Sequence, residues 1–171
     1  MKRKHKLIDF YITNKLIKRN LFIKALNNIN NFFLNQFMID CEDGLINFML
    51  YKTSNSLFFT KKIGYYYIKQ NTSITKSQNF TTRIRSNFLY LYYLLLNTKN
   101  NKIEKKYVDH YFLFIYNLHK TDINKIFGNI INDGKFYLKV IKQYLACDFI
   151  SLKAKGILYM LKSKVLLNSI K

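Results

Sequence analysis

The sequence predicts a helix-dominated α/β fold, with two short strands in its first half and only helices in its second half. Hydrophobic residues make up 49% of the 171 positions and aromatic residues 17%, which is enough for a buried core and is not typical of a disordered basic tail. Before Asn79, two short aromatic segments are bounded by turn-forming residues, and after it apolar residues recur at helical spacing over long stretches. The chain is therefore interpreted as two parts, 1–78 and 79–171.

The first predicted element is an amphipathic helix within Thr13–Leu26. Apolar side chains recur there in steps of one, three and four residues, although Asn20 can interrupt the helix. The asparagine-rich stretch Asn27–Asn31 is typical of a loop. A second helix is expected from about Glu42 to Lys52, because acidic residues there precede a strongly apolar helical pattern.

The two predicted strands are Ser56–Thr60 and Gly64–Ile68. Both are short and aromatic, and both are bounded by residues that favour turns. The segment Lys69–Gln78, which is rich in serine, threonine and asparagine, is predicted to be a loop.

The second half of the chain is predicted to be entirely helical. Asp133-Gly134 and Gly156 are its clearest interruptions. The predicted helices lie near Thr82–Asn97, Lys102–His119, Thr121–Asn132, Gly134–Phe149 and Ser151–Asn168.

Basic residues outnumber acidic residues by 29 to nine, and the formal net charge is +20. Such a charge attracts nucleic acid, anionic lipid or phosphorylated ligands, although part of the lysine content is also typical of an AT-rich genome. The basic cluster Met1–Lys6 is not followed by the apolar segment of a secretory signal. The longest apolar run, Phe88–Leu96, is much shorter than the roughly twenty residues of a membrane-spanning helix. We therefore expect a cytoplasmic protein that can contact a membrane peripherally.

The acidic residues are unevenly distributed, because Asp40, Glu42 and Asp43 form a cluster directly ahead of the second predicted helix. A helix N-terminus favours negative charge, so a carboxylate held there stays ionised and can accept a proton. The same residues can instead simply cap the helix, as aspartate often does. From this segment alone the capping interpretation is favoured, and the flanking segments change that balance.

Three segments, taken in their order along the chain, bear on the interpretation of this acidic cluster. Thr13–Arg19 is similar to an element written W-N-K-L-x-R-R, with Thr13 in place of tryptophan, and Glu42–Gly44 is similar to an E-D pair that opens a helix. Gly64–Ile68 followed by Ser73–Thr75 is similar to a strand and loop written Y-Y-x-R-x-x-x-S-I-T. Over about Tyr11–Lys76, the chain resembles the C-terminal, acceptor-side portion of a family 2 glycosyltransferase of the GT-A fold.

The resemblance implies an inverting transfer of sugar from a nucleotide sugar to an acceptor hydroxyl. Asp43 matches the position of the general base, and Glu42 would orient the acceptor or neighbouring groups. The substrate-binding positions that it implies are Asn14, Lys15, Ser73 and Thr75. Under this interpretation residues 1–78 are part of a glycosyltransferase-like domain, and residues 79–171 are a helical tail packed on it.

The family binds its donor through an N-terminal half with an Asp-x-Asp motif that holds a divalent metal. This chain contains no Asp-x-Asp, and Lys69 follows the aromatic strand where the family often has arginine. We therefore expect no metal site within the chain, and Mg²⁺ or Mn²⁺ only together with a separate N-terminal half. The resemblance thus implies a truncated or split enzyme whose partners are a nucleotide sugar, a glycan or lipid-linked acceptor and that half.

The main alternative is a basic RNA-binding or organelle-type ribosomal protein without catalytic activity. Tyr65–Tyr67 could stack on bases, although no RNP, KH or zinc-knuckle spacing is present. A third interpretation is a helical interaction module in which tyrosine and phenylalanine form the core.

Asp109 and His110 are adjacent, but neighbouring residues on a helix point apart, so the pair is given no acid–base role. Cys41 and Cys147 lack the spacing of a metal or redox site, which suits a reducing compartment.

Overall fold

The structure, a computed structural model, describes residues 16–35, 41–56, 80–98, 101–128 and 133–168, which form helices and no strand. The predicted α/β fold of the GT-A kind is therefore wrong. Of the two segments predicted as strands, only Ser56 lies within the described residues, and it is not in a strand. The expectation failed because aromatic enrichment favours burial on any element: Phe88–Leu94 is just as aromatic, yet it is buried within a helix.

The chain divides into two compact units, Met1–Ser86 and Asn87–Lys171. The division falls inside one helix, whereas the boundary predicted at residue 78 lies outside the described residues. The helices of the first unit are α1 (Arg19–Asn27), α2 (Asn31–Leu34), α3 (Glu42–Thr53) and the start of α5 (Phe80–Asn97). Within this unit α1 packs against α3.

Helix α1 begins later than its apolar pattern predicts. Lys18 has extended backbone angles (φ −61°, ψ 130°), so the helix starts at Arg19, and Leu16 is fully exposed. Of the apolar residues that define the predicted stripe, only Ala25 is fully buried. A small buried residue suits a close approach of two helices, which is consistent with the packing of α1 on α3.

Helix α3 confirms the prediction for Glu42–Lys52. At its C-terminal end the Thr53 hydroxyl donates to the Met49 carbonyl at 2.9 Å, and the Ser54 hydroxyl donates to the Tyr51 carbonyl at 3.1 Å. Ser54 then adopts an extended backbone (φ −82°, ψ 139°). Hydroxyl groups that satisfy free carbonyls are a common way to end a helix.

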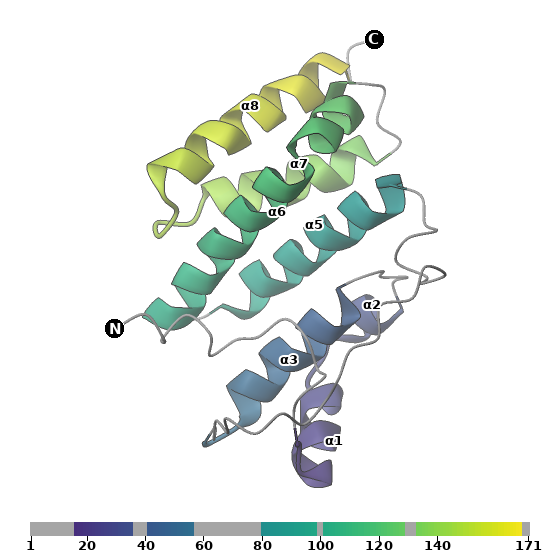
Figure 1. Ribbon diagram of the computed structural model, residues 1–171, viewed down its shortest axis with the longest axis vertical. Coiled ribbons are helices and arrows are strands. Elements are labelled where there is room, and N and C mark those ends of the chain that lie inside the picture. Colours follow the sequence, from purple (N-terminus) through teal and green to yellow (C-terminus); the bar gives the residue numbers. More distant parts are fainter. Residues whose placement is uncertain (1–15, 36–40, 57–79, 99–100, 129–132, 169–171) are drawn as a thin grey trace. The chain divides into compact units, whose positions relative to one another are not determined.

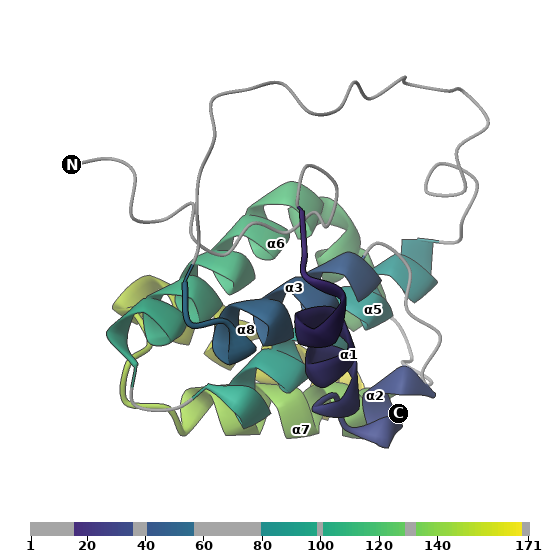
Figure 2. The ribbon, with the colours of Figure 1, turned by 90° about the horizontal axis from the view of Figure 1, so that it is seen from below.

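The second unit contains the remainder of α5 with α6 (Lys102–Gly128), α7 (Gly134–Leu145) and α8 (Leu152–Asn168). Helix α8 packs on both α6 and α7, as Figure 1 and the orthogonal view in Figure 2 show. These helices confirm the helical prediction for this half. The break predicted between the helices at 102–119 and 121–132 corresponds to a kink within α6, where His119 leaves helical geometry (φ −118°, ψ 21°).

The core of the second unit is built from aromatic rings. Phe88 of α5 meets Tyr137 of α7 edge to face, with ring centroids 5.1 Å apart, and lies 5.6 Å from Phe127 of α6. Phe112 of α6 and Tyr144 of α7 make a similar edge-to-face pair at 5.2 Å. Such pairs add to the stabilisation from burying the rings. For these residues, the interpretation of the aromatics as core is confirmed.

Two buried tyrosines of this core, Tyr111 and Tyr144, use their hydroxyl groups in hydrogen bonds. Tyr111 donates to the side-chain oxygen of buried Asn87 at 2.8 Å. Tyr144 donates to the Val108 carbonyl at 3.3 Å and lies 3.5 Å from the Asp109 carboxylate. Burial raises the pKa of Tyr144, and Asp109 raises it further, so its hydroxyl stays a donor. These hydrogen bonds favour one packing arrangement of the aromatic rings over alternative arrangements.

Asp109 also fixes the start of α8. Its carboxylate accepts hydrogen bonds from the backbone N–H and the hydroxyl of Ser151, each at 3.2 Å. The Ser151 hydroxyl oxygen in turn accepts the N–H of Ala154 at 3.3 Å, which is the geometry of an N-cap. One carboxylate on α6 therefore links the end of α7, through Tyr144, to the beginning of α8. The sequence had suggested no role for this residue.

Candidate functional site

Two carboxylates open helix α3. Glu42 and Asp43 occupy its first turn, where Glu42 is exposed and Asp43 is half-buried. The N–H of Leu45 already donates to the Cys41 carbonyl at 3.1 Å, so both acids lie on regular helix rather than on a loop. The N-terminal end of the helix dipole favours their negative charge. This position holds a carboxylate on a regular helix while part of it meets solvent.

The capping interpretation is not supported for Asp43. The N-cap residue is Cys41 (φ −123°, ψ −7°), and it makes no side-chain cap hydrogen bond. Cys41 itself is fully buried, so it acts as a small hydrophobic anchor and not as an exposed thiol. Asp43 thus lies two residues after the N-cap, within the first turn of the helix, where its negative charge favours the helix.

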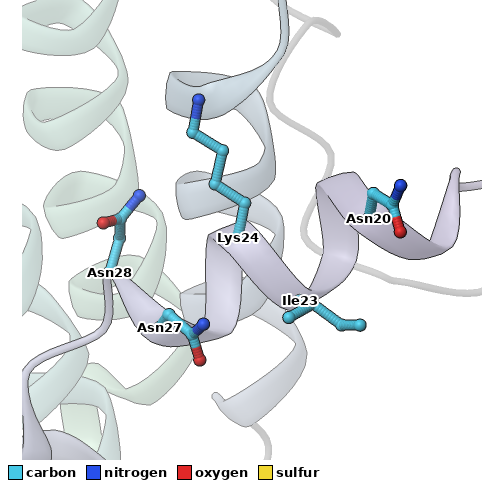
Figure 3. Close-up of a pocket in the computed structure, with 5 residues that line it drawn as sticks. All are labelled: Asn20, Ile23, Lys24, Asn27 and Asn28. Atoms are coloured by element: carbon cyan, nitrogen blue, oxygen red, sulfur yellow. The ribbon is translucent and has the colours of Figure 1, made fainter.

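A shallow hollow of about 330 Å³ runs along α1 in the same unit. Figure 3 shows its lining side chains, which are Asn20, Ile23, Lys24, Asn27 and Asn28. Three amides and an ammonium group offer donors and acceptors suited to hydroxyl-bearing ligands. The helical spacing of these polar residues in the sequence could have indicated a shared face, but Asn20 was interpreted only as a possible interruption of the helix. Glu42 and Asp43 do not line this hollow.

The other residues predicted to bind substrate lie outside the described part of the chain. This applies to Asn14, Lys15, Ser73 and Thr75, and also to the tyrosines at 65–67 that the RNA interpretation uses. Their roles therefore stay predictions.

The described residues form neither a metal site nor a membrane-spanning helix. Within the ranges that the structure describes, no three or more histidine, cysteine, aspartate or glutamate residues gather as a metal site would require. In those same ranges no helix combines the length and the apolar character needed to cross a bilayer. Burial raises the pKa of the Cys147 thiol, which keeps it protonated and unreactive.

No protein-family model matches the chain, and no curated protein or solved structure matches it either. What the chain does must therefore be inferred from its own residues.

Proposed function

We propose that this chain supplies the acceptor-side carboxylate of a glycosyltransferase-like enzyme, with Asp43 as the general base. The observation that carries the proposal is the placement of Glu42 and Asp43 on the first turn of α3, a helix held by packing on α1. A general base needs a fixed position and partial access to solvent, and Asp43 has both. The ordered motifs between Thr13 and Thr75 supply the reaction class.

In the proposed reaction, the Asp43 carboxylate takes the proton of an acceptor hydroxyl. The acceptor oxygen then forms a bond to the anomeric carbon of the nucleotide sugar, while the bond from that carbon to the diphosphate oxygen breaks. The nucleotide diphosphate leaves from the opposite face, so the anomeric configuration inverts. Glu42, exposed beside Asp43, would orient the acceptor. The amide-lined hollow of α1 is suited to sugar hydroxyl groups in the same unit.

The donor side of the reaction needs a separate nucleotide-binding half. The described residues provide no cluster that fits a divalent metal, so no step of the proposal passes through one. Any metal that stabilises the leaving diphosphate would be held by that other half.

The proposal is tested by two measurements on the full chain. The first is binding to an array of immobilised glycans, which does not require a donor. The second is release of free nucleotide from a panel of nucleotide sugars in the presence of a bound glycan, Mn²⁺ and any co-expressed nucleotide-binding half. We expect Asp43→Asn to retain glycan binding and to lower turnover by roughly 10²- to 10⁴-fold, the usual contribution of a general base.

Asp122→Asn is the matched control, because Asp122 is also a half-buried helical aspartate but lies on α6. It should leave turnover unchanged. Full turnover in Asp43→Asn, or the absence of both glycan binding and nucleotide release, would contradict the proposal.

The second candidate, RNA binding without catalysis, is favoured by the charge of +20. Many of the described tyrosines are core residues, so a stacking platform is not available from Tyr90, Tyr93 or Tyr137, and phosphate contacts by lysine would dominate. An RNA affinity that falls steeply between about 50 mM and 200 mM salt and does not change in Asp43→Asn would support this candidate instead.

A further inference from the structure

Helix α8 is apolar on two opposite sides. One side faces the second unit and is formed by the buried residues Ala154, Leu158, Leu161 and Val165. These four recur at helical spacing, and they pack where α8 meets α6 and α7. A surface helix of a globular protein usually carries polar residues on its other side. Helix α8 does not.

The opposite side of α8 carries a line of exposed apolar residues, here called the α8 stripe: Leu152, Tyr159, Met160, Leu166 and Leu167. Leu152, Leu167 and Tyr159 are 87%, 64% and 57% exposed, respectively. Positions seven apart on an α-helix differ by only about 20° in direction, so Leu152, Tyr159 and Leu166 fall on one line. Large apolar residues aligned on one exposed face indicate a surface that meets another apolar medium.

Two smaller residues, Gly156 and Ser163, lie on this face and do not interrupt its apolar character. The hydroxyl of Ser163 donates to the Tyr159 carbonyl at 3.0 Å, so it can enter an apolar environment without losing a hydrogen bond. At Gly156 an added Cβ would meet nothing within 4 Å, so among the residues that the structure describes none covers the face there. The stripe is therefore continuous from one end of α8 to the other.

Lysines border the stripe on both sides. Helical geometry places Lys153 and Lys164 along one edge and Lys155 and Lys162 along the other. Helix α8 contains no aspartate or glutamate. Lys164 donates to the side-chain oxygen of Asn124 at 2.8 Å, a neutral partner that leaves its charge uncompensated. An apolar line between two rows of cations is the pattern of a helix that lies in the plane of an anionic bilayer surface.

We propose that the α8 stripe docks on membranes that contain anionic phospholipid, with α8 lying in the interface. The aliphatic residues would enter the acyl boundary, and Tyr159 would sit at headgroup level, where an amphipathic ring is favoured. The bordering lysines would extend to the phosphate and carboxylate groups of the lipids. This docking is independent of the proposed sugar transfer, because Asp43 lies in the other compact unit.

Charge decides against the other occupants of this face. A second copy of the chain would bring two lysine-bordered helices together on molecules that each carry +20, with no acid on α8 to offset the repulsion. Nucleic acid would satisfy the lysines but would leave Leu152, Leu166 and Leu167 without an apolar partner. Only a surface that is both anionic and apolar satisfies both features of the helix.

The chain contains no tryptophan, so a single introduced tryptophan reports its own environment. Tyr159→Trp places the probe in the centre of the stripe, and Phe114→Trp places it at a similarly exposed site on α6, at 60% against 57%. We expect vesicles of phosphatidylcholine and phosphatidylserine to shift the emission of Tyr159→Trp to shorter wavelength. Pure phosphatidylcholine vesicles should not do so, and Phe114→Trp should not respond to either.

The affinity for the same mixed vesicles, measured by co-sedimentation, tests the stripe itself. Leu152→Ser with Leu167→Ser should weaken binding at least about tenfold, because several buried methylene groups are lost. Phe114→Ser with Leu118→Ser removes comparable exposed apolar area from α6 and should not weaken it. Since all four residues are exposed, the circular dichroism and the unfolding midpoint should stay unchanged, which separates docking from folding.

The lysines are tested in the same way. Lys153→Ala with Lys155→Ala should reduce vesicle affinity by roughly fivefold for each charge removed. The exposed pair on α7, Lys135→Ala with Lys142→Ala, changes the net charge equally and should have a smaller effect. No binding to mixed vesicles, an equal loss in the α6 control variant, or a dimer that the stripe variant converts to a monomer would overturn the proposal.

Discussion

Helices α3 and α8 have similarly apolar compositions, but the structure uses them differently. In α3 the consecutive residues Phe48, Met49 and Leu50 are all buried, although they point in different directions around the helix. In α8 the buried residues occupy one side only, and leucines on the other side remain exposed. An apolar helix is therefore not a sufficient sign of an internal helix. The accessible side must be established from the structure, and that side is where a surface function can lie.

The largest expected difference between the two helices lies in the cost of truncating an apolar side chain. Phe48 is 0% exposed, so Phe48→Ala should lower the free energy of unfolding by about 3–5 kcal/mol, through lost burial and the cavity left behind. Leu152→Ala, on the exposed side of α8, should change it by less than about 0.5 kcal/mol. Equilibrium denaturation in urea measures both values.

Leu50→Ala and Leu161→Ala complete that comparison, since both leucines are buried, one on each helix. Each should cost about 2–5 kcal/mol. A large cost for Leu152→Ala would mean that its side of α8 is covered in the free protein, and the contrast between the two helices would then disappear.

A smaller effect is expected at the contact that places α8. Asp109→Ala removes the acceptor for the N–H and hydroxyl of Ser151 and a neighbour of the Tyr144 hydroxyl. Hydrogen bonds to a charged acceptor contribute more than neutral ones, so we expect a loss of about 1.5–3 kcal/mol in the free energy of unfolding. The loss should be accompanied by faster amide hydrogen exchange in the first turn of α8.

Removing any aspartate from a chain with a charge of +20 also increases self-repulsion. Asp122→Ala, on the same helix α6, measures that general effect and should cost much less than Asp109→Ala. Equal losses in the two variants would show that Asp109 acts through net charge and not through Ser151.

Much of the helical half was predictable from the sequence because its signals are local. The apolar repeat and the glycine at Gly134 placed α7, and the apolar repeat placed α8, each to within a few residues. The interruption of α6 at His119 was predictable as well, because the predicted helices 102–119 and 121–132 meet at that point. Asp109 could not be identified in this way, because its partner Ser151 lies 42 positions away and only the packing of α8 on α6 brings them together.

The α/β prediction failed for a related reason. Short aromatic runs favour strands only when a sheet is available to bury them, and a helical core buries the same residues equally well. The exposed face of α8 could not be predicted from the sequence either. Apolar residues surround this helix, so no periodicity distinguishes the side that is buried against α6 and α7 from the side that is exposed. At the candidate site, the helix that begins at Glu42 was predictable, whereas the hollow along α1 was not.

A further pair of small effects separates the two sides of α8. Gly156→Ala should raise the free energy of unfolding by about 0.5–1 kcal/mol, because alanine favours a helix interior and its Cβ would meet no atom within 4 Å. The reverse change on the buried side, Ala154→Gly, should lower it by more than that, since helix propensity and packing are both lost. Thermal unfolding of the two variants beside the parent protein measures the difference. If Gly156→Ala were destabilising instead, its side of α8 would already be in contact with another surface, and it could not remain open for a membrane.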